Sequence, residues 1–246
     1  MRLSMLLSYG GSGRAVEGSA RMLRVLLVAA AGAMMAMSGP ARSQTANVEA
    51  SAKDVKPVRI AALGDSLTAG YGLPANAAFP VRLQRALAAK GIATEIHNAG
   101  VSGDTTSGGL ARLDWSIPEG TEAVILELGA NDALRGVDPK VTRDALDGIL
   151  NRLKAKNIAV LLCGMYAPPN YGSEYVAKFN AIYPELAKAY KVPLYPFFLD
   201  GVATDAKLTQ PDGLHPTEAG VDVIVERILP TVEAFLKDRA SQLSKP

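Results

Sequence analysis

A serine between two glycines is the first residue of this chain whose setting could support chemistry. The segment Gly64–Gly70 (GDSLTAG) directly follows Val58–Leu63, an apolar run rich in strand formers. In α/β proteins the loops at the carboxyl ends of strands line the ligand crevice, so the Ser66 hydroxyl stands where a nucleophile would act. A hydroxyl is a weak nucleophile until a base removes its proton. The chain must therefore also supply a base, a group that orients the base, and donors for an oxyanion.

Histidine suits the role of base because imidazole titrates near neutral pH, and the chain has only two. His215 stands in the turn-like sequence DGLHP, three residues after Asp212, a spacing that lets the two side chains meet across one turn. A carboxylate there accepts the Nδ1 proton, fixes the tautomer and stabilises the imidazolium. His97 lies inside a strand pattern, where a surface or packed histidine is the usual outcome. We predict His215 as the base and Asp212 as its orienting partner.

Two further segments that follow predicted strands offer donors for an oxyanion. Asn131, in the sequence GAND, can aim its side-chain amide into the crevice. Gly103, in the sequence SGD, can present its backbone N–H without a Cβ in the way. The N–H of Ser66 is the third predicted donor, and losing one such donor costs about 10²–10³ in kcat. Taken singly, Asn131 and Gly103 are more typical of turns than of an oxyanion hole. The prediction therefore depends on their shared place after strands of one sheet.

Several other residues are expected to be structural. Asp65 is predicted to cap the helical turn that follows it, and Asp104 and Asp132 are predicted to cap loops. Trp115 is predicted to be a packing residue. Cys163, the only cysteine, ends an apolar run and is predicted to be a buried, unreactive thiol. One cysteine and two histidines leave no Cys/His metal cage. No cofactor is predicted, because a serine nucleophile with a histidine base needs neither a metal nor an organic group.

Strand-like apolar runs alternate with longer helical patterns from residue 57 onward. The predicted strands are Val58–Leu63, Thr94–Asn98, Ala123–Leu128, Ala159–Cys163 and Leu194–Phe197. The predicted helices are Phe79–Lys90, Thr105–Asp114, Val141–Lys156, Tyr175–Tyr190 and Glu218–Lys237. This alternation, with such apolar strands, predicts an α/β fold with a parallel sheet covered on both faces. The stretch 164–173 is a loop by composition and is expected to border the site because it follows a strand.

The first 43 residues have the composition of a targeting segment. Arg24 precedes an apolar stretch that runs to about residue 37, and small residues follow, as in a secretory signal peptide. The apolar core is short for a membrane span of about 20 residues, and an uncleaved anchor is the alternative. Cleavage is expected after Ser38 or Ser43, and Met22 is the alternative start, with 1–21 upstream of it. Residues 44–56 are polar and are predicted to form a flexible tether.

The net positive charge of the chain comes from that leader. Residues 1–43 contain five arginines and one glutamate, a net +4, whereas the whole chain carries +2. The remainder therefore carries about −2, which gives no support to a nucleic-acid surface or a polybasic membrane surface. About 190 residues remain from position 57, enough for one domain with a sizeable core. We predict a periplasmic or secreted protein with a small-molecule partner, no nucleic acid and no stable membrane insertion after leader removal, and a monomer is favoured.

Four of these segments resemble the four motif blocks of the SGNH (GDSL) hydrolase family and occur in the family's order. They are GDSL at 64–67, SGDTT at 102–106, GAND at 129–132 and DGLHP at 212–216. The chain is most similar to the bacterial periplasmic multifunctional thioesterase, lysophospholipase and arylesterase group, on segments 64–72, 102–105, 109–113 and 134–136. The resemblance implies the SGNH fold over residues 57–240, a flavodoxin-like three-layer α/β/α sandwich around a central parallel five-stranded sheet.

The resemblance also implies a role for each matched residue. Ser66 would be the nucleophile, His215 the base and Asp212 its orienting partner, with Ser66, Gly103 and Asn131 as the oxyanion hole. It implies acyl-ester and thioester substrates, with loops such as 164–173 shaping the acyl groove. The expected function is a secreted serine esterase that acts on aryl and short-to-medium acyl esters and acyl thioesters, with lysophospholipids as a further class. The alternatives are a carbohydrate O-deacetylase of the same fold and a non-catalytic ligand-binding module.

Overall fold

The structure is a computed structural model that describes residues 56–243. A single sheet contains five parallel strands in the order β2-β1-β3-β4-β5, which is the flavodoxin-like order. The strands are β1 (Val58–Gly64), β2 (Thr94–Gly100), β3 (Ala123–Glu127), β4 (Ala159–Cys163) and β5 (Leu194–Tyr195). The predicted five-stranded parallel sheet is confirmed.

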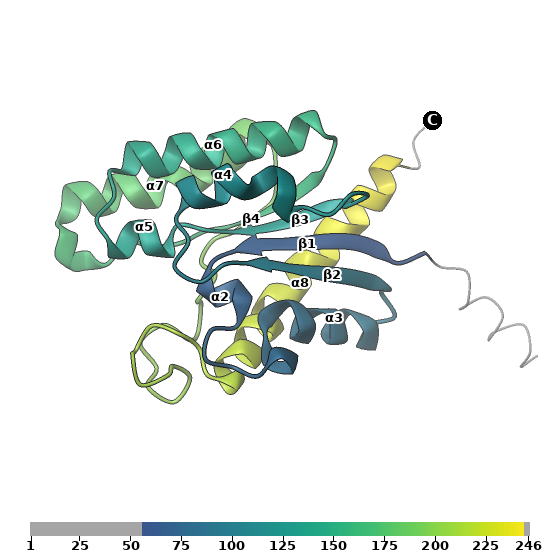
Figure 1. Ribbon diagram of the computed structural model, residues 1–246, viewed down its shortest axis with the longest axis horizontal. Helices are drawn as coiled ribbons and strands as arrows, with labels where there is room; N and C mark the ends of the chain where they lie inside the picture. The colour runs from purple at the N-terminus through teal and green to yellow at the C-terminus, as the bar shows by residue number, and fades with distance from the viewer. Residues whose placement is uncertain (1–55, 244–246) are drawn as a thin grey trace, which may run out of the picture. The chain divides into compact units, whose positions relative to one another are not determined.

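Helices cover both faces of the sheet and complete the three predicted layers (Figure 1). One face carries α3 and α8, and the other carries α4, α6 and α7. The helices are α2 (Ser66–Ala69), α3 (Phe79–Ala89), α4 (Thr106–Ser116), α5 (Ala130–Leu134), α6 (Pro139–Ala155), α7 (Ser173–Tyr190) and α8 (Glu218–Leu243). Two 3₁₀ turns, η1 (Ala75–Ala77) and η2 (Pro169–Tyr171), lie in the connections.

The core forms because the central strands are apolar toward both layers of helices. All of β3 is buried, and so is β1 from Ile60 to its end. A strand that is covered on both sides needs a continuous apolar run, which is the pattern that predicted these strands. From α3, the side chains of Phe79, Leu83 and Leu87 are fully buried. Their spacing of four residues places them on one face of the helix.

The structure moves some predicted boundaries. The last helix, α8, continues to Leu243 rather than ending at Lys237, and β5 ends at Tyr195 rather than at Phe197. Neither α2 nor α5 is among the predicted elements, because helices of four and five residues are too short to show an apolar period. Both short helices follow strand ends, so they lie at the edge of the sheet where ligands bind in such folds.

Trp115 is not the packing residue that the sequence predicts. Its side chain is 76% exposed, because α4 turns a different face to the core. The buried residues of that face include Gly109, Arg112, Leu113 and Ser116. Position 115 falls on the solvent side of the same helix, so the apolar character of tryptophan does not decide its burial here.

A buried guanidinium joins the carboxyl ends of β1 and β2. Arg112 is 5% exposed and donates to the carbonyl oxygens of Gly64 and Ala99, each at 2.8 Å. Its Nε also lies 2.6 Å from Asp104 Oδ2. Asp104, which the sequence predicted as a loop cap, is instead the counter-ion of this cation. A Cβ on Gly108 would lie 1.9 Å from Asp104 Oδ1, so glycine leaves the space that the carboxylate occupies.

The predicted leader, residues 1–43, and the predicted tether up to residue 55 lie outside the described residues. Over 56–243, no helix is both long and apolar enough to cross a bilayer. The described elements begin at Val58 and end at Leu243, whereas the domain limits at 57 and 240 stay predictions.

Arg112→Met is expected to lower the free energy of unfolding by about 3–5 kcal/mol, because Asp104 would keep a nearly buried charge without its partner. The two strand-end carbonyls would lose donors as well. Urea unfolding followed by circular dichroism measures the change. In the control Arg152→Met, the lost ion pair with Asp114 is exposed, so the change should stay below about 1 kcal/mol. Equal losses in the two variants would contradict a structural role for the buried cation.

Candidate active site

Ser66 lies at the carboxyl end of β1 as the first residue of α2. The preceding Asp65 is the N-cap of that helix, and its Oδ1 accepts the Leu67 N–H at 2.9 Å, which confirms the predicted cap. A Cβ on Gly64 would lie only 2.1 Å from a side-chain oxygen of α2, so glycine allows the strand and helix to meet closely. Gly70 ends the helix with φ of +83°, a conformation that favours glycine.

His215 lies between Ser66 and Asp212. Its Nε2 is 2.9 Å from Ser66 Oγ, and its Nδ1 is 2.6 Å from Asp212 Oδ2. The other carboxylate oxygen of Asp212 accepts the backbone N–H groups of Leu214 and His215. These hydrogen bonds, and first of all the one from the His215 backbone, lower the pKa of Asp212 to about 2. An ionised carboxylate at Nδ1 keeps the proton on that nitrogen and leaves Nε2 to accept the serine proton.

Contacts from the segment after α2 hold the loop that carries His215. Gln210 N donates to His215 O at 2.7 Å, and Gln210 Nε2 donates to Tyr71 O at 2.8 Å. The centroids of the Tyr71 and His215 rings are 4.6 Å apart. A Cβ on Gly72 would lie 2.4 Å from the Gln210 side-chain oxygen, so glycine makes room for this contact. The sequence gives no role to Gln210 or to Tyr71, although Tyr71 lies in the segment 64–72 that resembles the family, because these contacts form only when distant segments meet.

Asn131 and Gly103 come together at the ends of two other strands. Asn131 lies in α5, shortly after β3, and lines the same cavity as Ser66 and His215. Gly103 follows β2 with φ of +82°, where a residue with a side chain would be strained. Arg135 joins the two, because its Nη2 donates to Gly103 O at 2.9 Å and to Asn131 Oδ1 at 3.3 Å. Three of the predicted site residues therefore share one cavity, and Gly103 is tied to Asn131.

Two buried carboxyl groups, Asp65 and Glu127, lie behind the nucleophile. Asp65 N donates to Glu127 Oε2 at 3.4 Å, and Thr68 Oγ1 donates to the same oxygen at 2.7 Å. Burial raises the pKa of Asp65 to about 6. Burial, followed by the charge of Asp65, raises the pKa of Glu127 well above its usual range. Both carboxyl groups are therefore harder to ionise than exposed ones, and the place of Glu127 in a strand pattern does not reveal this.

The cavity beside Ser66 is small and mostly apolar. Its volume is about 190 Å³, and its wall includes Leu134, Met165, Tyr166 and Leu199. The Tyr166 ring stacks on Phe197 with centroids 4.7 Å apart, and both rings line the cavity. Met165 and Tyr166 belong to the loop 164–173, which therefore borders the site as predicted.

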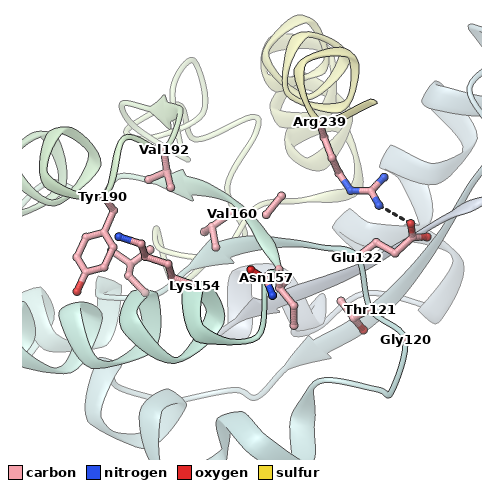
Figure 2. Close-up of a pocket in the computed structure, with 12 residues that line it drawn as sticks. Gly120, Thr121, Glu122, Lys154, Asn157, Val160, Tyr190, Val192 and Arg239 are labelled. Atoms are coloured by element: carbon pink, nitrogen blue, oxygen red, sulfur yellow. Dashed lines mark hydrogen bonds and ion pairs between the residues drawn. The ribbon is translucent and has the colours of Figure 1, made fainter. Parts of the chain in front are cut away.

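A larger hollow lies at the amino ends of the strands, on the opposite edge of the sheet (Figure 2). Its volume is about 570 Å³, and it is lined by residues such as Gly120, Asn157 and Val160. Glu122 and Arg239 form an ion pair at its wall. Among the described residues that line this hollow there is no serine, cysteine or histidine. The smaller cavity beside Ser66 is therefore the candidate site, because it has the reactive side chains.

The remaining residues singled out from the sequence lie away from the cavity. His97 is exposed on β2, and Cys163 is fully buried, where burial raises the pKa of its thiol. Asp132 accepts the Thr106 N–H at 2.9 Å and so satisfies the first turn of α4, as a capping residue does. Among residues 56–243, no cluster of three or more histidine, cysteine, aspartate or glutamate side chains could hold a metal ion.

A serine, an imidazole and a carboxylate hydrogen-bonded in this order, at the carboxyl edge of a parallel sheet, define the class of serine hydrolases. The chain belongs to the GDSL-like Lipase/Acylhydrolase family, whose model matches residues 62–223. It is therefore an acyl hydrolase, and the predicted family is confirmed.

Named relatives and a solved structure agree with this assignment. The chain is 39% identical over 175 residues to esterase TesA of Pseudomonas aeruginosa, over 71% of this chain and 87% of that protein. It is 45% identical over 155 residues to thioesterase 1/protease 1/lysophospholipase L1 of Escherichia coli (strain K12), over 63% of this chain and 73% of that protein. The crystal structure of AlinE4, an SGNH-hydrolase family esterase, is similar with a TM-score of 0.62 and 46% identity, over 73% of this chain and 97% of that chain.

Glu127 is expected to make the protein less stable as pH rises. Its pKa is about 4.5 in the unfolded chain and well above that in the folded protein, so between these values the folded state binds more protons. Stability then falls by at most about 1.4 kcal/mol per pH unit. In Glu127→Gln this loss is absent, so the unfolding free energy of the variant should improve relative to wild type from about pH 5 to pH 7.

Urea unfolding at several pH values in this range measures the trend. Glu174→Gln is the control, because Glu174 is exposed and its pKa is lowered rather than raised. A constant difference between Glu127→Gln and wild type would mean that Glu127 is ionised in the folded protein.

Proposed function

We propose that the chain hydrolyses carboxylic esters and acyl thioesters through a covalent acyl-enzyme on Ser66. The observation that carries the proposal is the hydrogen-bonded line from Ser66 Oγ through the His215 ring to Asp212, with lengths of 2.9 and 2.6 Å. It supports Ser66 as nucleophile, His215 as general base and Asp212 as the carboxylate that orients the base. The reaction uses neither a metal nor an organic cofactor.

In acylation, His215 Nε2 takes the proton of Ser66 while Oγ forms a bond to the acyl carbon. The electron pair of the carbonyl moves to its oxygen, which accepts hydrogen bonds from the N–H groups of Ser66 and Gly103 and from the Asn131 amide. The bond to the alcohol or thiol then breaks, and the leaving group takes the proton from His215 Nε2. Asp212 stabilises the imidazolium that exists between the two proton transfers.

Deacylation repeats these steps with water as the nucleophile. His215 removes a proton from the water as its oxygen attacks the acyl carbon, and the same donors hold the second oxyanion. When the intermediate collapses, Ser66 Oγ leaves and regains a proton from the imidazolium, and the carboxylic acid is released. Asp212 is ionised throughout, because its pKa lies at about 2.

The cavity supports short-to-medium acyl groups and aryl esters as substrates. Leu134, Met165 and Leu199 offer apolar wall around about 190 Å³, and each buried CH₂ is worth about 0.8 kcal/mol. The stacked rings of Tyr166 and Phe197 suit an aromatic substituent. The relatives named esterase and thioesterase/lysophospholipase fall within the same range of acyl compounds. A carbohydrate O-deacetylase has less support, since this wall offers few partners for sugar hydroxyls.

Secretion is part of the proposal. It rests on the basic start, short apolar core and small residues of positions 1–43, with cleavage after Ser38 or Ser43. The substrate would then be a small acyl compound in the periplasm or outside the cell. All the groups that the mechanism uses come from one copy of the chain, which is consistent with a monomer.

Ser66→Ala is expected to lower kcat for p-nitrophenyl butyrate by about 10⁴-fold or more, because the acyl-enzyme cannot form. An alkyl fluorophosphonate should label the wild type once, at Ser66, as seen by mass spectrometry, and should not label the variant. Ser107→Ala, which changes an exposed serine on α4, should keep both activity and labelling. Wild-type turnover by Ser66→Ala would overturn the mechanism, and an unlabelled, inactive wild type would favour the non-catalytic binding module.

Leu199→Trp is expected to shorten the range of accepted acyl chains. A larger ring in a cavity of about 190 Å³ removes space for the distal carbons of the substrate. For p-nitrophenyl octanoate, kcat/KM should fall by about tenfold or more, while for the acetate it should stay within about twofold. Val141→Trp, at an exposed position on α6, should leave the chain-length profile unchanged. If Leu199→Trp also leaves it unchanged, the acyl chain binds elsewhere.

A further inference from the structure

The side-chain amide of Asn131 can face an oxyanion with an N–H group or with its own oxygen, and only the first orientation helps the reaction. The oxygen and nitrogen ends of an amide are nearly equal in size, so packing alone does not choose between them. Hydrogen-bond partners have to make that choice. Asn131 has two charged partners, which come from different segments of the chain.

The first partner of the Asn131 amide is Asp65. Asp65 Oδ2 lies 3.2 Å from Asn131 Nδ2, while Asp65 Oδ1 accepts the Leu67 N–H and caps α2. An ionised carboxylate only accepts hydrogen bonds, so it attracts the nitrogen end of the amide and repels the oxygen end. Because Asp65 is fully buried, water does not weaken this preference.

The second partner is Arg135, the C-cap of α5, which lies four residues after Asn131. Arg135 Nη2 donates to Asn131 Oδ1 at 3.3 Å. A guanidinium only donates hydrogen bonds, so it attracts the oxygen end of the amide. Asp65 and Arg135 therefore favour the same orientation. One Nδ2 hydrogen then faces Asp65, and the other is available to the cavity that Asn131 shares with Ser66.

We propose that Asp65 and Arg135 are positioning residues that hold the Asn131 amide with an N–H directed at the oxyanion. This inference rests on the proposed function, in which Asn131 is an oxyanion donor. Arg135 also donates to Gly103 O at 2.9 Å, so one guanidinium holds the loops of both donors. Asp65 connects the helix that begins at Ser66 to the helix that carries Asn131, which ties the nucleophile to the oxyanion hole.

Asp65→Asn separates this positioning role from the capping role. Asparagine is about as good an N-cap as aspartate, so the hydrogen bond from Leu67 and the start of α2 are kept. With its oxygen on the Leu67 N–H, the new amide presents N–H groups to Asn131. The new amide then competes with Arg135 for the Asn131 oxygen. Whenever Asn131 rotates to offer its oxygen to residue 65, a lone pair replaces the N–H that faced the oxyanion.

A double-mutant cycle with a p-nitrophenyl ester at pH 8 tests the proposal. Asp65→Asn is expected to lower kcat by about 10- to 100-fold with KM within about twofold, because the lost donor acts in the transition state. In the Asn131→Ala background, which by itself costs about 10²–10³, adding Asp65→Asn should change kcat by less than about threefold. Asp138→Asn is the matched control, since Asp138 caps α6 through the Lys140 N–H and the same chemical change there should leave kcat unaltered.

Two results would overturn the proposal. Asp65→Asn could leave kcat unchanged, or it could cost the same factor with and without the Asn131 side chain. Arg135→Met supplies a second cycle at an exposed position, where folding is not at stake. It should lower kcat by about 3- to 10-fold and have no further effect in Asn131→Ala, whereas Arg135→Lys, which still donates, should recover most of the activity. Additive losses in this cycle would likewise remove Arg135 from the proposal.

Ser66→Ala in the same series separates this inference from the proposed function. If Ser66→Ala kept its activity, the whole mechanism would fail. If Ser66→Ala were inactive while Asp65→Asn and Arg135→Met kept wild-type kcat, only the positioning of Asn131 would fail.

Discussion

The 2.9 Å contact between Ser66 Oγ and His215 Nε2 joins two residues 149 positions apart, and the chemistry of the site depends on it. Misplacing such groups by about 1 Å can cost about 10²-fold in rate, so both sides of the contact have to be held. On one side, Asp65 caps the helix that begins at Ser66. On the other side, Asp212 and Gln210 hold a loop without regular structure. The nucleophile is thus fixed by a strand end, and the base by hydrogen bonds within and around its loop.

The sheet explains why residues from three strands gather at one place. Strand β1 lies between β2 and β3, where the order of the strands reverses, and ligands bind at such points in open α/β sheets. The last residues of the three strands are also in register, because Gly64 pairs with Gly100 of β2 and with Glu127 of β3. The segments that follow the three strands therefore begin side by side at the same edge of the sheet. Arg112 holds the ends of β1 and β2 together there by donating to the carbonyl oxygens of Gly64 and Ala99.

Signals that lie within a short stretch of chain were enough to predict the sheet, most helices and the segments that meet at the site. The apolar runs of β1 and β3 and the glycines beside Ser66 are signals of this kind. The roles of Arg112 and Gln210 could not be predicted, because they arise from contacts between distant segments. Arg112 donates to a residue 48 positions away, and Gln210 to one 139 positions away. The prediction that Trp115 packs in the core is wrong for a related reason. The elements packed against α4 decide which face of the helix is buried, and the apolarity of one residue does not.

The pair of acids behind the nucleophile is costly to the fold, and the oxyanion hole gives a reason for keeping it. Burial opposes ionisation of both acids, and the shift of the Asp65 pKa to about 6 records that cost. Replacing such groups by apolar residues is often neutral or stabilising in other proteins. An apolar residue at 65, however, would neither cap α2 nor accept from the Asn131 amide. A fixed amide dipole needs an acceptor that cannot also donate, and a buried carboxylate meets that need where water is absent. Of the two carboxyl groups, Asp65 is the one that contacts Asn131, and its hydrogen bonds from Leu67 and Asn131 favour its ionised form.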